Sequence, residues 1–145
     1  MEQLTYTTLG EWKGYLLRQA PERVLQFGEG NFLRGFADDF IDRMNERAGF
    51  YGRVVVVPPA SAGKAGRINA QQGLYQLCLR GKQNGAVVEE RRMIRCISRA
   101  LDVFADWDEL LRTACQPELR FVISNTTEAG IVYDPACKLE DVPAS

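Results

Sequence analysis

The chain has 145 residues, about the length of one domain, and is 46% hydrophobic and 26% charged, which is typical of globular proteins and not of disordered or fibrous ones. Eighteen basic and nineteen acidic side chains give a net charge of -1, so no long-range field favours DNA or RNA, and we expect no nucleic-acid partner. The sequence has no histidine, which removes the commonest general base and the commonest metal ligand and argues against serine hydrolases and zinc enzymes.

Two elements are predicted before the glycine turn at residues 28–30. Leu9, Trp12 and Leu16 recur at helical spacing, so the pattern predicts an amphipathic helix from Thr8 to Gln19 that ends before Pro21. The short apolar stretch from Arg23 to Phe27 runs directly into glycines, which is typical of a buried strand that ends in a tight turn.

A second helix and a second strand follow this turn. Asn31 is the expected N-cap of the helix. Its predicted buried stripe comprises Phe32, Leu33, Phe36, Ala37, Phe40, Ile41 and Met44. Its predicted outer face comprises Asp38, Asp39, Asp42, Arg43 and Glu46. The four valines within Arg53 to Val57 then indicate a parallel strand that is covered on both faces, so the three elements form a βαβ unit.

The second half departs from simple alternation. Leu74 to Arg80 and Ala86 to Ile94 are strand-like, and Asn84-Gly85 between them is a hairpin-turn signal. A helix is predicted from Asp106 to Cys115, with Trp107, Leu110, Leu111 and Ala114 on one face, before a strand from Leu119 to Ser124. Tyr133 to Ser145 has no clear period and is expected to be a loop. The predicted class is α/β: a Rossmann-like NAD(P)-binding fold, mostly parallel, with an antiparallel hairpin excursion.

The turn after the first strand is a candidate phosphate site. Gly28 permits a tight turn, and Gly30 lets the backbone approach a pyrophosphate, which the helix N-terminus beyond it attracts. Leu33 occupies the position of the third glycine in the GxGxxG pattern, so the fingerprint is only partly met. Arg34 could pair with a phosphate or carboxylate or be an ordinary surface arginine. A turn without a ligand remains the alternative for the glycines.

The acidic residue that usually binds the adenosine ribose is missing. It is expected roughly 20 residues after the turn, but no Asp or Glu lies between Glu46 and Glu89. Lys64 and Arg67 could instead bind a 2′-phosphate or form a solvated basic loop, so the residues alone leave NADP open. The same absence argues against an S-adenosylmethionine methyltransferase.

A second polar segment follows the last predicted strand. Ser124, Asn125 and Thr126 come at its carboxyl end, where open α/β sheets bind ligands. Their hydroxyl and amide groups could hydrogen-bond a ribose and a carboxamide, and Glu128 could orient a ribose or a substrate group. The alternative is an Asx or Ser/Thr turn.

Three stretches together resemble a known family. QFGEGNFLRGFADDFID (26–42), the hairpin from Gly73 to Glu90, and FVISNTTEAGI (121–131) are similar, in order and spacing, to the tagaturonate reductase branch of the mannitol dehydrogenase family. The resemblance covers nearly the whole chain from Val24 onward.

This resemblance implies a metal-independent, NAD-dependent oxidoreductase that interconverts D-altronate and D-tagaturonate, with a small sugar acid as its substrate. It implies a cofactor turn at Gly28, Gly30, Asn31, Phe32 and Arg34, and a nicotinamide-side segment at Ser124, Asn125, Thr126 and Glu128. The family's catalytic lysine, asparagine and histidine belong to a helical C-terminal domain, so we expect no catalytic residue here. Residues 1–145 are therefore expected to be a truncated N-terminal dinucleotide-binding domain, inactive alone.

Three alternatives remain open. The chain could be a free-standing nucleotide-binding or regulatory module, a purely structural α/β domain, or part of a related fructuronate or mannitol-type polyol dehydrogenase.

The rest of the sequence gives weaker expectations about location and thiol state. No apolar run approaches the roughly 18 residues of a membrane span and no signal peptide is apparent, so we expect a soluble cytoplasmic protein without membrane contact. Its four cysteines form no CxxC pair and are expected to be buried reduced thiols, with no metal site.

Overall fold

A four-stranded parallel sheet lies at the centre of the chain in the computed structural model, which describes residues 3–9, 17–59, 63–126, 131, 133–138 and 140–141. The strands are β1 (Glu22–Phe27), β2 (Arg53–Val57), β5 (Ile97–Ala100) and β6 (Phe121–Ser124), in the order β5-β2-β1-β6. Both predicted strands of the βαβ unit are confirmed, and the last predicted strand begins two residues later than expected.

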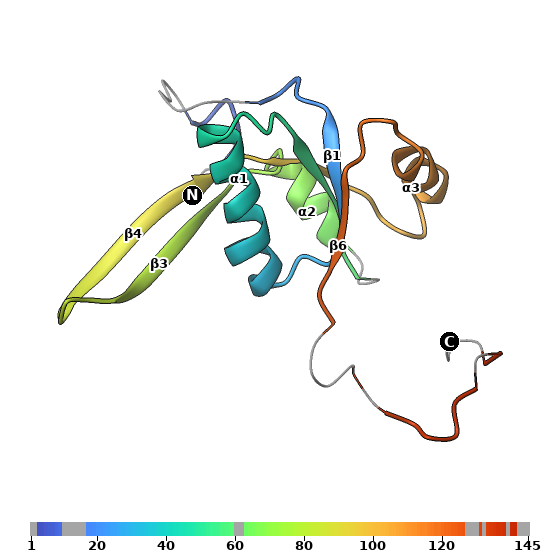
Figure 1. Ribbon diagram of the computed structural model, residues 1–145. Coiled ribbons are helices and arrows are strands. Elements are labelled where there is room, and N and C mark those ends of the chain that lie inside the picture. The colour runs from blue at the N-terminus through green and yellow to red at the C-terminus, as the bar shows by residue number, and fades with distance from the viewer. Residues whose placement is uncertain are drawn as a thin grey trace.

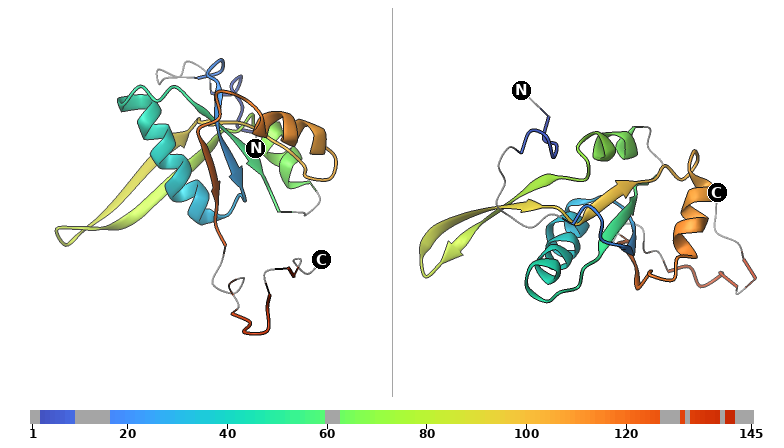
Figure 2. Two further views of the ribbon diagram at one scale, coloured as in Figure 1. Left: turned by 45° about the vertical axis from the view of Figure 1, so that its right-hand side comes forward. Right: turned by 90° about the horizontal axis from the view of Figure 1, so that it is seen from above.

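Helices cover both faces of this sheet (Figures 1 and 2). Alternate residues of each strand point to opposite sides, so Val24, Val54 and Val56 pack with Ile41 of α1 (Asp38–Arg47) and Ala65 of α2 (Lys64–Ala70). On the other side, the core contains Leu25, Val55, Val57, Leu101 and Leu110, the last from α3 (Trp107–Ala114). The result is a three-layer α/β arrangement, as the continuous valine run predicts.

The antiparallel excursion is confirmed as a separate two-stranded sheet. β3 (Tyr75–Gln83) pairs with β4 (Ala86–Ile94), and the hairpin projects away from the central sheet in Figure 1. Asn84 and Gly85 have φ of 52° and 82°, both in the left-handed region that a two-residue hairpin turn requires. β3 begins one residue later and ends three residues later than predicted, because pairing with β4 continues through Gly81 to Gln83.

Two elements were not predicted. α2 lies where the sequence indicates a loop, since a seven-residue segment containing Gly66 and Asn69 has weak helix propensity. The Asn69 side chain exchanges two hydrogen bonds with the backbone of Ala100, at 2.7 and 2.9 Å, so tertiary contacts hold α2. β5 contains Ser98 and Arg99 and lacks an apolar run, so its pairing with β2 determines its conformation.

The predicted burial of the second helix is wrong for most of its length. Leu33 and Ile41 are buried, but the side chains of Phe32, Phe36, Phe40 and Met44 are exposed. The predicted outer face contains the fully buried Asp38 and Asp42 and the nearly buried Asp39. The helix therefore presents its acidic face to the protein and an aromatic ridge to solvent.

Smaller expectations have mixed outcomes. Of the predicted first helix, residues 10–16 lie outside the described part, and the flanking residues form turns. α3 is one residue shorter at each end than predicted, and it buries Leu110 while exposing Trp107 and Leu111. Cys96 is buried, whereas the other three cysteines are exposed free thiols, so the expectation of buried thiols is wrong for them. No helix among the described residues is long and apolar enough to cross a membrane.

Candidate functional site

The glycine turn joins β1 to the helix beyond it. The Gly28 amide donates to the Val57 carbonyl at the end of β2 (2.8 Å), and the Arg34 amide donates to the Gly30 carbonyl (3.0 Å). Gly30 is therefore the capping residue, and the helix already includes Asn31. The prediction of Asn31 as N-cap is wrong by one position, because Gly30 supplies the first carbonyl acceptor without a side chain.

The two glycines of the turn are required for different reasons. Gly28 has φ of +111°, and a Cβ there would lie 3.0 Å from Leu33 Cδ1, so the backbone conformation itself demands glycine. Gly30 has no positive φ, and a Cβ built on it would meet nothing within 4 Å. The fold alone therefore does not require glycine at position 30; the open space above it leaves room for a ligand against the backbone.

A cleft of about 400 Å³ lies at the carboxyl ends of the parallel strands. Its lining residues are Phe27, Gly28, Val57, Pro58, Pro59, Val103, Ser124 and Asn125. Phe27 pairs with Ser124 across β1 and β6, so sheet register brings the two predicted segments together. Ligands of open α/β sheets bind at this edge, outside the strand ends.

The other predicted residues are spread around the turn. Asn31 and Arg34 line a neighbouring hollow with Tyr75, and the Phe32 side chain is exposed. Thr126 is exposed beyond β6, and Glu128 lies outside the described residues.

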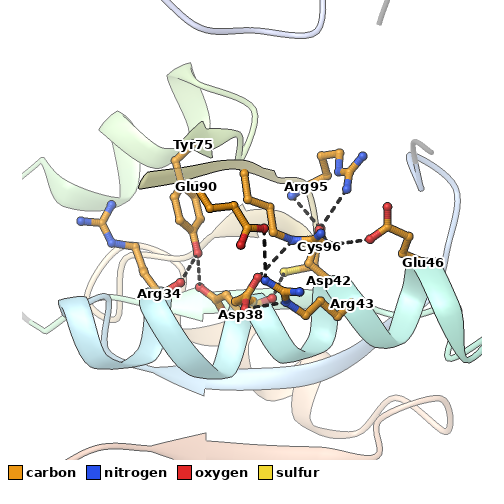
Figure 3. A network of polar contacts seen from close by, with 11 residues as sticks. Arg34, Asp38, Asp42, Arg43, Glu46, Tyr75, Glu90, Arg95 and Cys96 are labelled. Atoms are coloured by element: carbon orange, nitrogen blue, oxygen red, sulfur yellow. Dashed lines mark hydrogen bonds and ion pairs between the residues drawn. The ribbon is translucent and has the colours of Figure 1, made fainter. Parts of the chain in front are cut away.

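After its first two residues, the helix contains a π-helical segment, η1 (Leu33–Ala37), in which the Asp38 amide donates to the Leu33 carbonyl five residues earlier. The Tyr75 hydroxyl, from β3, lies 2.7 Å from the Arg34 carbonyl and 3.2 Å from Asp38 Oδ2 (Figure 3). The Arg34 guanidinium lies over the Tyr75 ring, 5.4 Å from its centroid. Isolated π turns often occur at functional sites, and here Tyr75 fixes the turn that carries Arg34.

Asp38 has an unusual environment behind the turn. Burial raises the pKa of its carboxyl to about 7, although hydrogen bonds from Tyr75 and Gln26 and the charge of Arg34 oppose this rise. Burial, with the adjacent Asp38 carboxylate, also raises the pKa of Tyr75. Gln26 is fully buried in β1 and donates to the Gly28 carbonyl at 3.2 Å. A polar layer therefore supports the glycine turn from below.

Ion pairs attach the acidic face of α1 to the hairpin (Figure 3). Arg92 of β4 contacts Asp39, Asp42 and Glu46 at 3.0, 2.9 and 2.8 Å. Arg95 donates to Asp42 through both its amide (2.9 Å) and its guanidinium (3.1 Å). These partners explain why the acidic face is buried.

A basic hollow lies on the other side of the turn. Its lining residues are Glu29, Arg34, Lys64, Arg67, Ile68 and Gln71. Lys64 Nζ lies 2.6 Å from Glu29 Oε1. The sequence predicted a loop at Lys64 and Arg67, whereas the structure places both residues on α2. Sequence reasoning did not identify four residues near the turn: Gln26, Glu29, Asp38 and Tyr75. Of these, Gln26 could have been found, because a glutamine within an apolar strand indicates a buried polar contact.

Together, the three-layer parallel sheet and the glycine turn between β1 and its helix define a Rossmann-type domain. The sequence model described as "Mannitol dehydrogenase Rossmann domain" matches residues 22–144, so the chain belongs to the mannitol dehydrogenase family.

Individual relatives agree with this assignment. The chain is 55% identical over 127 residues to altronate oxidoreductase of Bacteroides thetaiotaomicron, and 51% identical over 125 residues to that of Bacillus subtilis. These matches cover 88% and 86% of this chain but 26% of each relative. The chain thus spans about a quarter of the length of these curated relatives.

Solved structures show the same fold. A D-sorbitol dehydrogenase in substrate-free form matches with a TM-score of 0.73 and 21% identity, covering 88% of this chain and 28% of that structure. Pseudomonas fluorescens mannitol 2-dehydrogenase, in a ternary complex with NAD and D-mannitol, matches with a TM-score of 0.71 and 22% identity. That match covers 86% of this chain and 26% of the other.

Proposed function

We propose that this chain is the NAD-binding part of a longer oxidoreductase that interconverts D-altronate and D-tagaturonate. The observation that carries the cofactor assignment is the open space at Gly30, where the fold would accept a side chain but a bound pyrophosphate would not. The reaction assignment is supported by the identity of more than half to a relative named altronate oxidoreductase.

The residues of this chain would bind and orient the cofactor. The Gly28–Gly30 backbone and the helix N-terminus beyond it would face the pyrophosphate. Ser124 and Asn125, across the cleft from Gly28, would hydrogen-bond the nicotinamide half, with Thr126 and Glu128 extending that segment. Bound NAD supplies the hydride acceptor or donor. The group that moves the substrate's proton would come from outside residues 1–145, because hydride transfer needs an acid/base group beside the reacting carbon.

The proposal includes a small sugar acid as substrate and a cytoplasmic location, where the NAD pool resides. A related fructuronate or polyol dehydrogenase is the second candidate, because the likeness to the sorbitol and mannitol enzymes extends over the same domain.

Replacement of Gly30 tests the cofactor site. Gly30→Asp should fold normally, because its Cβ meets no atom within 4 Å, but its carboxylate would repel the pyrophosphate. We expect saturable NADH binding in calorimetry for the parent chain and at least a tenfold weaker affinity in the variant, or about 1.4 kcal/mol.

Gly66→Asp is the matched control, since Gly66 also has free space around a Cβ and lies outside the cleft. Equal NADH affinity in the parent and Gly30→Asp would contradict the proposal. For the reaction, the protein at its natural length should oxidise altronate with NAD, and turnover of only polyols or fructuronate would favour the second candidate.

A further inference from the structure

Glu29 lies in the glycine turn, beside the end of the second strand. In NAD-binding domains of this fold, a carboxylate at the end of the second strand usually accepts hydrogen bonds from the adenosine ribose hydroxyls. The chain has no acidic residue between Glu46 and Glu89, so β2 and the segment after it supply none. Glu29 is the neighbour of Gly28, whose amide is bonded to Val57, the last residue of β2. The glycine turn therefore brings a carboxylate to the end of β2 from the adjacent strand.

The carboxylate of Glu29 is held in one place. Lys64 Nζ, at the start of α2, lies 2.6 Å from Glu29 Oε1, and the Glu29 side chain is only 20% exposed. Both residues line the same basic hollow as Arg34 and Arg67. A carboxylate fixed in this way has a second oxygen for a ribose hydroxyl, whereas a loose surface glutamate would have no defined direction.

We propose that Glu29, oriented by Lys64, is the residue that selects NAD over NADP, a role that rests on the proposed function as a NAD-binding domain. The Glu29 carboxylate accepts a hydrogen bond from the ribose 2′-hydroxyl of NAD. It repels the 2′-phosphate of NADP, and its pairing with Lys64 removes the nearest ammonium from that phosphate. Without Glu29, the three basic side chains of the hollow would face the phosphate directly.

The test compares cofactor affinities in the protein at its natural length. NADH and NADPH are titrated by fluorescence into the parent protein and into Glu29→Gln, which keeps the size of the side chain and removes its charge. We expect the ratio of the NADPH to the NADH dissociation constant to fall at least tenfold in Glu29→Gln. The double variant Glu29→Gln/Lys64→Met should keep part of this shift, because the carboxylate that repels the 2′-phosphate is still absent, and lose the part that comes from the released ammonium.

Glu118→Gln is the matched control, since it removes a carboxylate that pairs with Arg23 at 3.6 Å, away from the hollow; its ratio should equal that of the parent. An unchanged ratio in Glu29→Gln would overturn the proposal. An equal loss of affinity for both cofactors would also overturn it, because it would show that Glu29 only maintains the conformation of the turn. If the parent binds neither cofactor, the proposed function fails and this inference falls with it.

Discussion

Asp38 shows how one buried side chain ties the stability of the domain to pH. It is fully buried between β1, β3 and its own helix, where it faces Tyr75, Gln26, Arg34 and Asp42. Burial disfavours the charged carboxylate, so the pKa of Asp38 rises from 3.8 to about 7. Between these values, the folded protein holds a proton that the unfolded chain releases.

This difference predicts that Asp38 makes the protein less stable as pH rises. Its contribution to the free energy of unfolding should decrease by about 4 kcal/mol in total from about pH 4 to about pH 7 and then stay constant. Asp38→Asn cannot titrate, so urea unfolding at a series of pH values should lack this decline. Tyr75→Phe is the control: it keeps the carboxyl and removes a hydrogen bond that lowers its pKa, so the decline should persist. A decline of equal size in Asp38→Asn would refute this assignment.

At the scale of elements, sequence periodicity identified α1 but assigned its faces incorrectly. Helical spacing shows which residues share a stripe, and an apolar stripe is normally the buried one. Here the ridge of Phe32, Phe36 and Phe40 lies outside, with ring centroids 5.2 and 6.3 Å apart. The acidic face lies inside because Arg92 of β4 and Arg95, directly after β4, contact it from some fifty residues later in the chain. No local pattern contains that pairing, and the same holds for β5 and α2, which depend on distant partners.

The two faces of the continuous helix formed by η1 and α1 predict losses of stability of different size for similar substitutions. Leu33→Ala removes a side chain that is 4% exposed and should destabilise the domain by about 2 to 4 kcal/mol. Phe36→Ala removes a larger side chain that is 53% exposed, and should cost no more than about 1 kcal/mol, mainly from its contact with Phe32. Chemical unfolding of the 145-residue chain measures both. A larger loss for Phe36→Ala than for Leu33→Ala would show that the ridge is buried.

At the scale of the whole molecule, the sequence predicted the parallel sheet and the hairpin, and it singled out two segments that the structure brings to one cleft. These features follow from local signals: a valine run, an Asn-Gly turn, and polar residues directly after strands. The polar layer of Gln26, Asp38 and Tyr75 under the turn could not be predicted, because its members come from three elements that only the complete fold brings together. The pairing of Glu29 with Lys64 could not be predicted for the same reason, because the two residues lie on different elements.

The outer half of the β3–β4 hairpin is separate from the core, so we expect it to contribute little to the stability of the domain. Residues 81–90 are all exposed, whereas Tyr75, Leu77 and Ile94 at its base pack against the core. Removing two paired positions from each strand, Gly81-Lys82 with Val87-Val88, keeps the alternation of faces and the Asn84-Gly85 turn.

The free energy of unfolding of the shortened chain should lie within about 1 kcal/mol of that of the parent, and the shortened chain should bind NADH equally well. Leu77→Ala, at the base, should cost about 2 kcal/mol by comparison. Thermal unfolding and NADH titration of the three proteins measure this difference. A loss in the shortened chain as large as that of Leu77→Ala would mean that the outer hairpin supports the domain, because only buried contacts can carry that much stability.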